Sequence, residues 1–294
     1  MIVAFTPCPC LDRVLLLPGL TPRALHRPLG VVERAGGKGL NLVRAVVRLG
    51  GKGVALAPLG GWSGAEVRRL ARREGLPLAA WRGGRTRLCH ILLAPEGPTE
   101  VYEPCPPLGL RGLAHMARLA PEGTRVLSGS LPPGLAPEEA LRVLKPFAVD
   151  SSPAFPAALR LGGGAGVGLI KPNRQELAGL HPGAPQEAAE ALHRASGVRV
   201  LASLGEEGAV YAGPEGVWWA RGPRREGNPV GSGDTLLGAF LLGLEEGWPL
   251  GEALAFAVAA ATANVGRGGG EVALAEVREL LPSVEVGRGL PGRG

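Results

Sequence analysis

The feature that most constrains the fold is a repeated alternation of short apolar runs with runs of helical period. The pairs include GVALAPLG before SGAEVRRLARREG, RVLSGS before APEEALRVL, and GVGLIKPN before RQELAGL. A strand followed by a helix, repeated along a chain, builds a mostly parallel sheet with helices on both faces. The sequence therefore predicts an α/β protein of three αβα layers around a mostly parallel central sheet.

Two segments interrupt this alternation, residues 12–34 and 84–104. Both lack a helical period and contain strand-like runs, so we expect them to form a small β-sheet lid over the strand ends. The lid and the central sheet would belong to a single domain at residues 1–285, followed by a frayed tail at 286–294. Apolar residues on the lid would favour pairing with a second copy, which predicts a homodimer.

The net charge of +6 would suit nucleic acid, an anionic membrane or small acidic substrates. The basic residues are scattered and aromatic residues make up only 4 % of the chain, which argues against a nucleic-acid surface. No run of eighteen apolar residues occurs, and the first residues read as a strand rather than a leader. We therefore expect a cytoplasmic protein that acts on small anions and not on membranes.

Four cysteines occur, at Cys8, Cys10, Cys89 and Cys105. Their spacing does not match a zinc knuckle, and a reduced compartment favours free thiols. We expect buried structural thiols, with a metal site as the alternative.

The stretch GNPVGSGDTLLGAF, residues 227–240, places glycines and one carboxylate directly before a helical run. Asp234 could simply cap that helix, but residue 237 is Leu, so a capping box is missing. Gly231 and Gly233 would let the backbone approach a ligand, and the helix would direct its free N–H groups at that point. A carboxylate beside such an anion hole suits a general base in phosphoryl transfer.

A second glycine-led helix begins in AGGKGLN, residues 35–41. It is not a P-loop, because Lys38 is followed by Gly39 rather than Ser or Thr. Lys38 offers a positive charge to a phosphate, and Asn41 offers a donor and an acceptor to a hydroxyl.

These two motifs, with SGSLPPG, DSS, KPNRQEL and SLGEEGA in this order, resemble the ribokinase-like (PfkB) carbohydrate kinases over essentially the whole chain. The form of the motifs is similar to that of 1-phosphofructokinases and tagatose-6-phosphate kinases. The resemblance implies Mg²⁺-dependent transfer from ATP to a ketohexose phosphate, with fructose 1-phosphate as the expected acceptor. Tagatose 6-phosphate and fructose 6-phosphate are the alternatives, and a non-catalytic regulator that binds sugar phosphate or nucleic acid is the alternative from another class.

The resemblance also implies a role for each motif residue. Asp234 would be the catalytic base, beside an anion hole formed by the backbone of Gly231, Ser232 and Gly233. The residues expected to bind the sugar phosphate are Asp12, Gly36, Gly37, Lys38, Asn41, Arg87 and Ser130. Those expected to bind the nucleotide are Lys171, Asn173, Glu176, Ser203, Gly205, Gly208 and Asn264, with Glu176 acting on Mg²⁺ through water rather than as a direct ligand.

Two of the expected nucleotide residues, and two further positions on the sugar side, leave a question open. Lys171 could instead be a solvated strand end, and Asn264 could pair within its own helix. Cys8 and Tyr102 stand where 1-phosphofructokinases often have Asn, and both departures lie on the sugar side.

Overall fold

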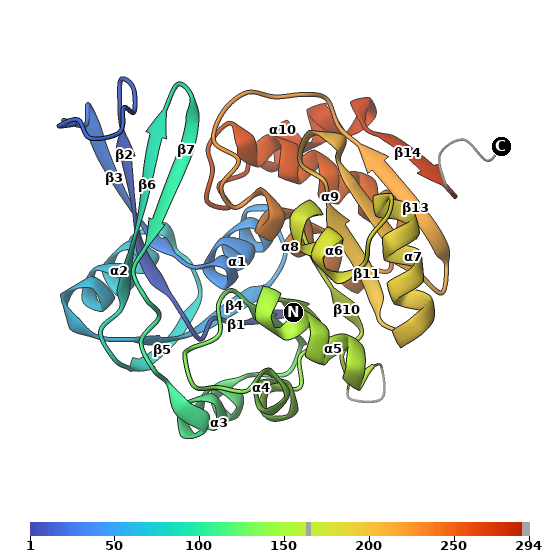
Figure 1. Ribbon diagram of the computed structural model, residues 1–294, viewed down its shortest axis with the longest axis horizontal. Coiled ribbons are helices and arrows are strands. Elements are labelled where there is room, and N and C mark those ends of the chain that lie inside the picture. The colour runs from blue at the N-terminus through green and yellow to red at the C-terminus, as the bar shows by residue number, and fades with distance from the viewer. Residues whose placement is uncertain (163–165, 290–294) are drawn as a thin grey trace.

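Two sheets of different size organise the computed structural model, which describes residues 1–162 and 166–289 (Figure 1). Within those residues the large sheet has ten strands and the small sheet has four. The seven strands from β11 to β5 are parallel, and β12, β13 and β14 continue the sheet in antiparallel pairs. In order across the sheet they are β14 (Glu285–Arg288), β13 (Gly216–Arg221), β12 (Ala209–Gly213), β11 (Arg199–Ser203), β10 (Leu169–Ile170), β9 (Ala148–Asp150), β8 (Thr124–Ser128), β1 (Ile2–Phe5), β4 (Gly53–Leu59) and β5 (Leu78–Arg82).

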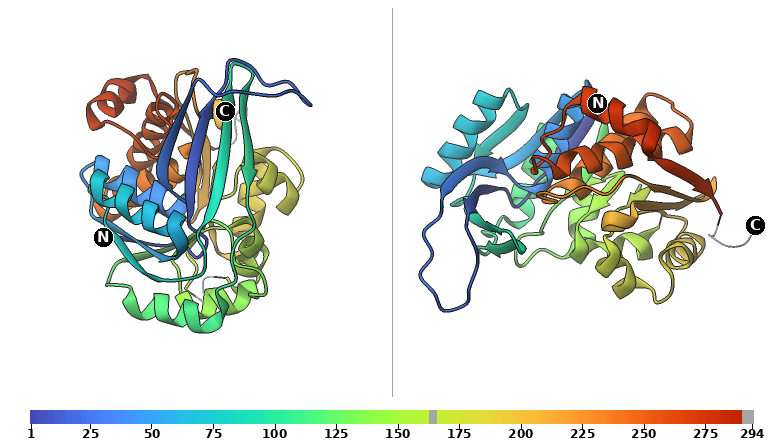
Figure 2. Two further views of the ribbon diagram at one scale, coloured as in Figure 1. Left: turned by 90° about the vertical axis from the view of Figure 1, so that its left-hand side faces the viewer. Right: turned by 90° about the horizontal axis from the view of Figure 1, so that it is seen from above.

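Helices cover both faces of this sheet, as the view from above shows (Figure 2). One face carries α1 (Lys38–Arg48), α2 (Gly61–Glu74), α8 (Ser232–Glu245), α9 (Leu250–Val265) and α10 (Leu274–Leu280). The other carries α3 (Gly109–Leu119), α4 (Pro137–Leu144), α5 (Phe155–Leu161), α6 (Arg174–Leu180) and α7 (Pro185–Ser196). Short 3₁₀ turns lie at Ser152–Ala154, Gly205–Glu207 and Leu281–Ser283. The predicted three-layer αβα fold is confirmed.

Strand β1 explains why the sheet can be covered on both sides. Side chains of a strand alternate between the two faces, and all four residues of β1 are apolar and fully buried. Ile2 and Ala4 join the core under α1 and α8, whereas Val3 and Phe5 join the core under α3, α4 and α5. Among the described residues, no helix has the length and hydropathy that crossing a membrane requires.

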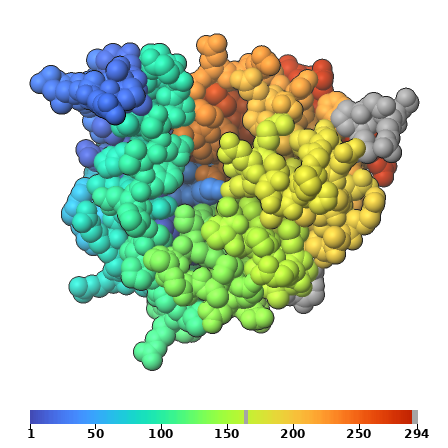
Figure 3. Space-filling model, in the orientation of Figure 1, coloured from blue at the N-terminus to red at the C-terminus, as the bar shows by residue number. Residues whose placement is uncertain are grey.

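The small sheet forms the predicted lid and projects from the body beside the strand ends (Figure 1). Its strands, in order, are β3 (Gly30–Gly36), β2 (Cys10–Leu16), β6 (Arg87–Ala94) and β7 (Gly97–Tyr102). The two predicted segments meet through the central pair, β2 and β6, which is parallel. The space-filling view shows the molecule hollowed between the lid and the body (Figure 3).

The tail differs from the expectation of fraying from residue 286. Residues Glu285–Arg288 form β14, which pairs antiparallel with β13. Gly287 lies so close to Trp219 that an added Cβ would be 2.3 Å from the ring. The short strand was hidden in a glycine-rich stretch, and residues 290–294 lie outside the described residues.

The expectation of four free thiols is wrong for one pair. Cys8, in the turn after β1, forms a disulfide with Cys105, which follows β7. Their Cα atoms are 5.7 Å apart although 97 residues separate them in sequence, so only the placement of the lid brings them together. Cys10 and Cys89 are free and buried, as expected.

The packing of α8 against α1 and α9 gives a stability prediction. Leu237 on α8 is fully buried, so Leu237→Ala leaves a cavity and should lower the free energy of unfolding by about 2–5 kcal/mol. Leu119→Ala, at an exposed position of α3, is the control and should change it by less than about 0.5 kcal/mol. Denaturant unfolding of both variants checks this, and equal effects would contradict the core assignment.

Candidate active site

Glycine backbone shapes the amino-terminal end of α8. Gly231 is the N-cap, with φ 82°, and an added Cβ would lie 3.0 Å from backbone atoms of Gly269 and Gly270. Asp234 lies in the first turn and does not cap the helix, so the capping interpretation of this carboxylate is wrong. The first N–H groups of a helix have no partner within it and attract anions, so the loop presents an anion-binding end.

Not every expected donor of this anion hole is free. The backbone N–H of Ser232 donates to the carbonyl of Pro229 at 3.0 Å, because the loop turns back on itself before the helix. The hole therefore depends on the N–H groups of Gly231 and Gly233 more than the motif alone indicates.

Asp234 has the environment of a base near neutral pH. Its side chain is 5 % exposed. Burial raises its pKa to about 6, the nearby charge of Asp150 adds to the rise, and Lys38 and Lys171 oppose it. A carboxylate with such a pKa is ionised at pH 7 and accepts a proton more readily than an ordinary aspartate.

A chain of hydrogen bonds fixes the orientation of this carboxylate. Asn41 on α1 donates from Nδ2 to Asp234 Oδ2 at 2.9 Å, and Arg44 donates to Asn41 Oδ1 at 2.9 Å. Arg44 therefore determines which end of the amide faces Asp234. Asn41, which we expected to bind sugar hydroxyls, is 5 % exposed, and both ends of its amide are engaged in hydrogen bonds, with Asp234 and with Arg44. Sequence reasoning missed Arg44, although it lies one helical turn after Asn41 on the same motif.

The loop after α9 supports the anion hole from behind. Asn264, which we expected near the adenine, is fully buried. It donates to the carbonyl of Val230 and to Ser232 Oγ, and accepts from the N–H of Gly270. This side chain therefore ties two loops together and does not face the cleft. The arrangement resembles the alternative that Asn264 pairs internally, although its partners lie outside its own helix.

Two lysines and an aspartate meet at the carboxyl end of β9. Asp150 Oδ1 lies 3.0 Å from Lys38 Nζ and 3.5 Å from Lys171 Nζ. Burial opposes ionisation of Asp150, but Lys171 and Lys38 outweigh it and lower the pKa of the carboxyl below its usual value. Lys171 is 3 % exposed, so it is not the solvated strand end of the alternative interpretation. Asp150 was not among the expected site residues, although DSS was recognised as a polar turn after a strand.

Lys171 also contacts the base loop. An added Cβ on Gly233 would lie 2.9 Å from Lys171 Nζ, so the ammonium sits against the first turn of α8. A cation is unfavourable at the positive end of a helix unless an anion joins the two. The convergence of Lys171, Lys38 and the helix end therefore favours a phosphate at this point.

Several buried polar atoms lie beside this charge cluster. Asp150 Oδ2, Ser128 Oγ, Ser151 Oγ and Thr6 Oγ1 have no hydrogen-bond partner within the described part of the chain. All four residues end or follow the adjacent parallel strands β1, β8 and β9. Buried polar atoms normally have partners, so this edge of the sheet is prepared for water, an ion or a substrate.

A cleft of about 920 Å³ extends from the anion hole past the ends of β11 and β13. The expected nucleotide residues that line it are Asn173, Ser203, Gly205 and Gly208, together with Ser232 and Gly233 of the base loop. The apolar wall comes from α8 and α9, through Leu236, Val258, Ala261, Thr262 and Val265. This wall was missed because its residues look like ordinary helix core in the sequence. Pro95, at the tip of the lid, reaches the same cleft.

Asn173 and Glu176 form a reciprocal capping box at the start of α6. Asn173 Oδ1 accepts from the N–H of Glu176 at 2.9 Å, and Glu176 Oε2 accepts from the N–H of Asn173 at 2.8 Å. Asp150 is the main cause of the raised pKa of Lys38, and Glu176, held by this box, adds a small part to the rise.

The lid supplies the opposite wall of the site through Asp12. Asp12 on β2 packs directly over Gly36 of β3, where an added Cβ would lie 2.3 Å from the carboxyl group. Gly37 then begins α1 as N-cap with φ 111°. Burial raises the pKa of Asp12 to about 6, and a hydrogen bond from the Cys10 thiol lowers it in part. Gly36 is therefore required for Asp12 to occupy this place.

Arg87 and Ser130 were expected to hold the phosphate of the substrate. Arg87 begins β6, and its guanidinium lies 5.5 Å from the ring centre of Tyr102. Its Nε is buried and, within the described residues, has no hydrogen-bond partner. Ser130 is exposed in the loop after β8. Arg87 thus has an unused donor within the described residues, whereas Ser130 is open to solvent.

The fold and this site are those of a small-molecule phosphotransferase, with a buried aspartate in the first turn of a glycine-led helix and a lid beside it. The model of the pfkB family carbohydrate kinases matches residues 8–276, and the chain belongs to this family.

Relatives of the chain divide between two phosphofructokinase activities. It is 30 % identical over 285 residues to the ATP-dependent 6-phosphofructokinase isozyme 2 of Escherichia coli, covering 89 % of this chain and 91 % of the relative. It is 33 % identical over 266 residues to the 1-phosphofructokinase of Xanthomonas campestris, covering 82 % and 83 %. The solved structure of phosphofructokinase-2 from Escherichia coli with substrates and products has a TM-score of 0.87 at 28 % identity, covering 96 % of this chain and 98 % of that one. The chain is therefore a carbohydrate kinase, a phosphotransferase with an alcohol group as acceptor.

The Asn41 hydrogen bond gives a pH prediction. It lowers the pKa of Asp234, so Asn41→Ala should raise that pKa above about 6 and move the acid limb of kcat/KM to higher pH. The pH profile of both proteins measures this. Asn228→Ala, in the loop before the anion hole and without a bond to Asp234, is the matched control. An acid limb that stays in place in Asn41→Ala would contradict the orienting role of Asn41.

Proposed function

We propose that this chain transfers the γ-phosphoryl group of ATP to a hydroxymethyl oxygen of fructose 1-phosphate. The observation that carries the proposal is the position of Asp234, beside the anion-binding end of α8 and near the charges of Lys171, which is buried, and Lys38, which is partly exposed. Phosphoryl transfer requires positioning and charge stabilisation rather than a covalent nucleophile. This chain offers those elements and no further chemistry is needed.

In the proposed reaction, Asp234 accepts the proton of the attacking hydroxyl. Asn41 occupies Oδ2, so Oδ1 is the oxygen left to receive it. The N–H groups at the start of α8, with Lys38 and Lys171, stabilise the charge that develops on the transferred group. The cleft lined by Ser203, Gly205 and Gly208 holds the nucleotide, with its adenine ring against the apolar wall of α8 and α9.

The residues fit a magnesium ion on the nucleotide side. Mg²⁺ prefers a few carboxylate oxygens and retains several waters. Asp150 Oδ2 is buried with no hydrogen-bond partner in the described chain, and Glu176 retains Oε1 beyond its capping bond. Asp150 and Glu176 would therefore hold the ion, in part through water, and the ion would neutralise charge on the phosphates.

The acceptor sugar would lie between α1 and the lid. Asp12 would bind its hydroxyl groups, and the unused Nε of Arg87 would bind the phosphate that it already carries. Lys38 would stand between the two substrates.

Fructose 6-phosphate is the second candidate acceptor. The similarity to the 6-phosphofructokinase isozyme of Escherichia coli, at 30 % identity, favours it. The presence of Cys8 and Tyr102, where 1-phosphofructokinases often have Asn, also favours fructose 6-phosphate.

An acceptor panel distinguishes these candidates. ATP consumption with Mg²⁺ is measured with fructose 1-phosphate, fructose 6-phosphate, tagatose 6-phosphate and fructose, and kcat/KM should be highest for fructose 1-phosphate. Asp234→Asn should lower kcat by roughly 10²–10⁴-fold and leave ATP binding unchanged, because it removes the base alone. Glu246→Gln, at the far end of α8, is the control. A preference for fructose 6-phosphate would select the second candidate, and near-normal turnover of Asp234→Asn would overturn the mechanism.

We also propose that two copies of the chain pair through their lids. The lid exposes several large apolar side chains, namely Leu25, Leu29, Val31, Val32 and Val101, with exposures from 41 % to 79 %. Such side chains are normally covered when a protein has a partner surface. The related phosphofructokinase-2 of Escherichia coli has a tetrameric inhibited form.

Sedimentation at micromolar concentration should therefore give a dimer. Val31→Glu combined with Val101→Glu should give a monomer, because two charges would be buried without partners. Leu110→Glu, on α3 and outside the lid, is the control and should remain a dimer. A monomeric unmodified protein would refute pairing through the lid.

A further inference from the structure

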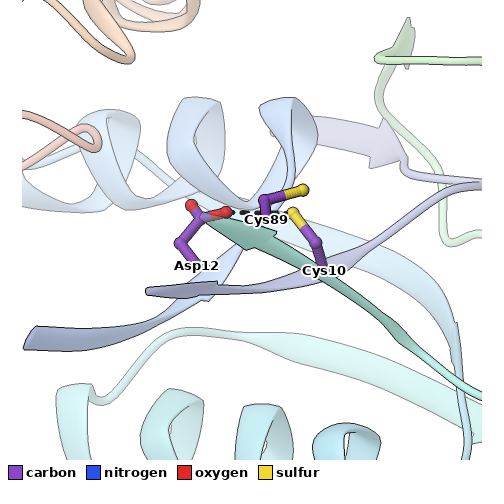
Figure 4. Close-up of side chains that lie close together, drawn as sticks. All are labelled: Cys10, Asp12 and Cys89. Carbon is purple, nitrogen blue, oxygen red and sulfur yellow. Dashed lines mark hydrogen bonds between the residues drawn. The ribbon is translucent and has the colours of Figure 1, made fainter. Parts of the chain in front are cut away.

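Two free thiols and the Asp12 carboxyl converge in the lid, on two neighbouring strands. Cys10 and Asp12 are two residues apart on β2, so their side chains point to the same face. Cys89 on β6 is the direct register partner of Asp12. The two sulfur atoms and a carboxylate oxygen lie within 4.8 Å of one another, and Cys10 Sγ donates to Asp12 Oδ1 at 3.0 Å (Figure 4).

This cluster is not explained by packing or by the kinase mechanism. Cys89 is fully buried, and Cys10 and Asp12 are 3 % and 8 % exposed. The mechanism above uses Asp12 but neither thiol. The disulfide does not use them either, since it joins Cys8 to Cys105.

We propose that Cys10, Cys89 and Asp12 form a binding site for a thiophilic divalent cation, with Zn²⁺ as the physiological type. Zinc accepts thiolate and carboxylate ligands in tetrahedral geometry, with bonds of about 2.3 Å to sulfur and about 2.0–2.2 Å to oxygen. Ligand atoms around such an ion are roughly 3.3–3.8 Å apart. Pairs of ligand atoms here lie within 4.8 Å, so none has to contract by more than about 1 Å, while Cys10 Sγ and Asp12 Oδ1, at 3.0 Å, would move slightly apart. Each thiol releases a proton to solvent as the ion binds. A water completes the fourth position.

The ligand atoms of this site favour a different ion from magnesium. Mg²⁺ demands oxygen ligands and binds thiolate poorly, whereas two sulfur donors select zinc or a similar soft ion. The site is on the lid, while Asp150 and Glu176, which fit Mg²⁺, belong to the large sheet and α6. The two cations therefore occupy different places.

Binding has a consequence that rests on the proposed function. A zinc ion on Asp12 would take one of its two carboxylate oxygens and neutralise charge that would otherwise attract sugar hydroxyls. The ion should therefore compete with the sugar phosphate and leave ATP binding unaffected, so that the lid carries an inhibitory metal site.

Spectroscopy tests the site without any assay of activity. The chelator-treated full chain, with its disulfide intact, is titrated with Co²⁺ and followed by the near-ultraviolet charge-transfer band of thiolate ligands. We expect one ion per chain, displaced by Zn²⁺ and unaffected by excess Mg²⁺. Cys89→Ala should weaken binding by at least roughly 10–100-fold, since even outer partners of a metal site contribute that much.

The matched control removes the other two cysteines. The double variant Cys8→Ala with Cys105→Ala keeps the cluster and should keep the band. Absence of a band in the unmodified chain, or a band that survives Cys89→Ala and disappears in the double variant, would overturn the proposal.

Kinetics then tests the consequence. Zn²⁺ should raise the apparent KM for the sugar phosphate but not for ATP, and Cys89→Ala should resist this effect. A chain that binds Co²⁺ as expected but phosphorylates no sugar would contradict the proposed function and leave the metal site standing. A chain that is active and indifferent to Zn²⁺ would contradict the inhibitory role.

Discussion

The buried guanidinium of Arg44 connects the parts on which the site depends. It donates to the carbonyls of Ala35 on β3 and Gly269 after α9, to Asn41 on its own helix, and to Glu74 on α2. Burying a charge costs several kcal/mol unless its hydrogen bonds are satisfied. Here each of the three nitrogen atoms of the Arg44 guanidinium donates at least one hydrogen bond. Since Asn41 in turn holds Asp234, this carboxylate is positioned by the lid strand, two helices and a glycine loop together. Its geometry belongs to the whole fold rather than to the local motif.

The carboxyl edge of the large sheet has the opposite character, because its charges are only partly compensated. Asp150 is shared by Lys38 and Lys171, and several hydroxyl groups beside it have no partner in the described chain. Such groups lower the stability of the free protein. The extensive apolar burial on both faces of the sheet offsets this cost, so polar groups can stay ready for a phosphate and an ion.

The fold could be predicted from the sequence because its evidence is local and repeated. The strand–helix alternation and the two segments without helical period each carry their own pattern, and the structure confirms them. The site was predictable where a motif marks a helix start, as at Gly231 and Asp234. What could not be predicted depends on distant chain segments meeting. Asp150 can be identified as a site residue only when lysines from two other parts of the chain are seen beside it. Cys8 lies next to Cys105 only once the lid is placed. Asn264 looked like a ligand contact because sequence cannot tell a buried tie from an exposed one.

The two walls of the site come from different parts of the fold. This difference bears on how members of the family could act on different acceptor sugars. The base, anion hole and lysine cluster come from α1, α8 and the large sheet, where a change would disturb Arg44 or the glycine backbone. Asp12 and Arg87 lie on the central strands β2 and β6 of the four-stranded lid, and Tyr102 ends its edge strand β7. None of the three belongs to the apolar cores that cover the large sheet, so a change of side chain there would disturb those cores little. Fructose 1-phosphate and fructose 6-phosphate both present a free hydroxymethyl group to a base, and they differ in where their existing phosphate must be held. An aspartate held by the whole fold, with a lid that tolerates substitution, would account for relatives of similar identity that carry the names of both activities. On the same argument, we expect residues of the lid to decide the acceptor of this chain, with Arg87 and Tyr102 first among them.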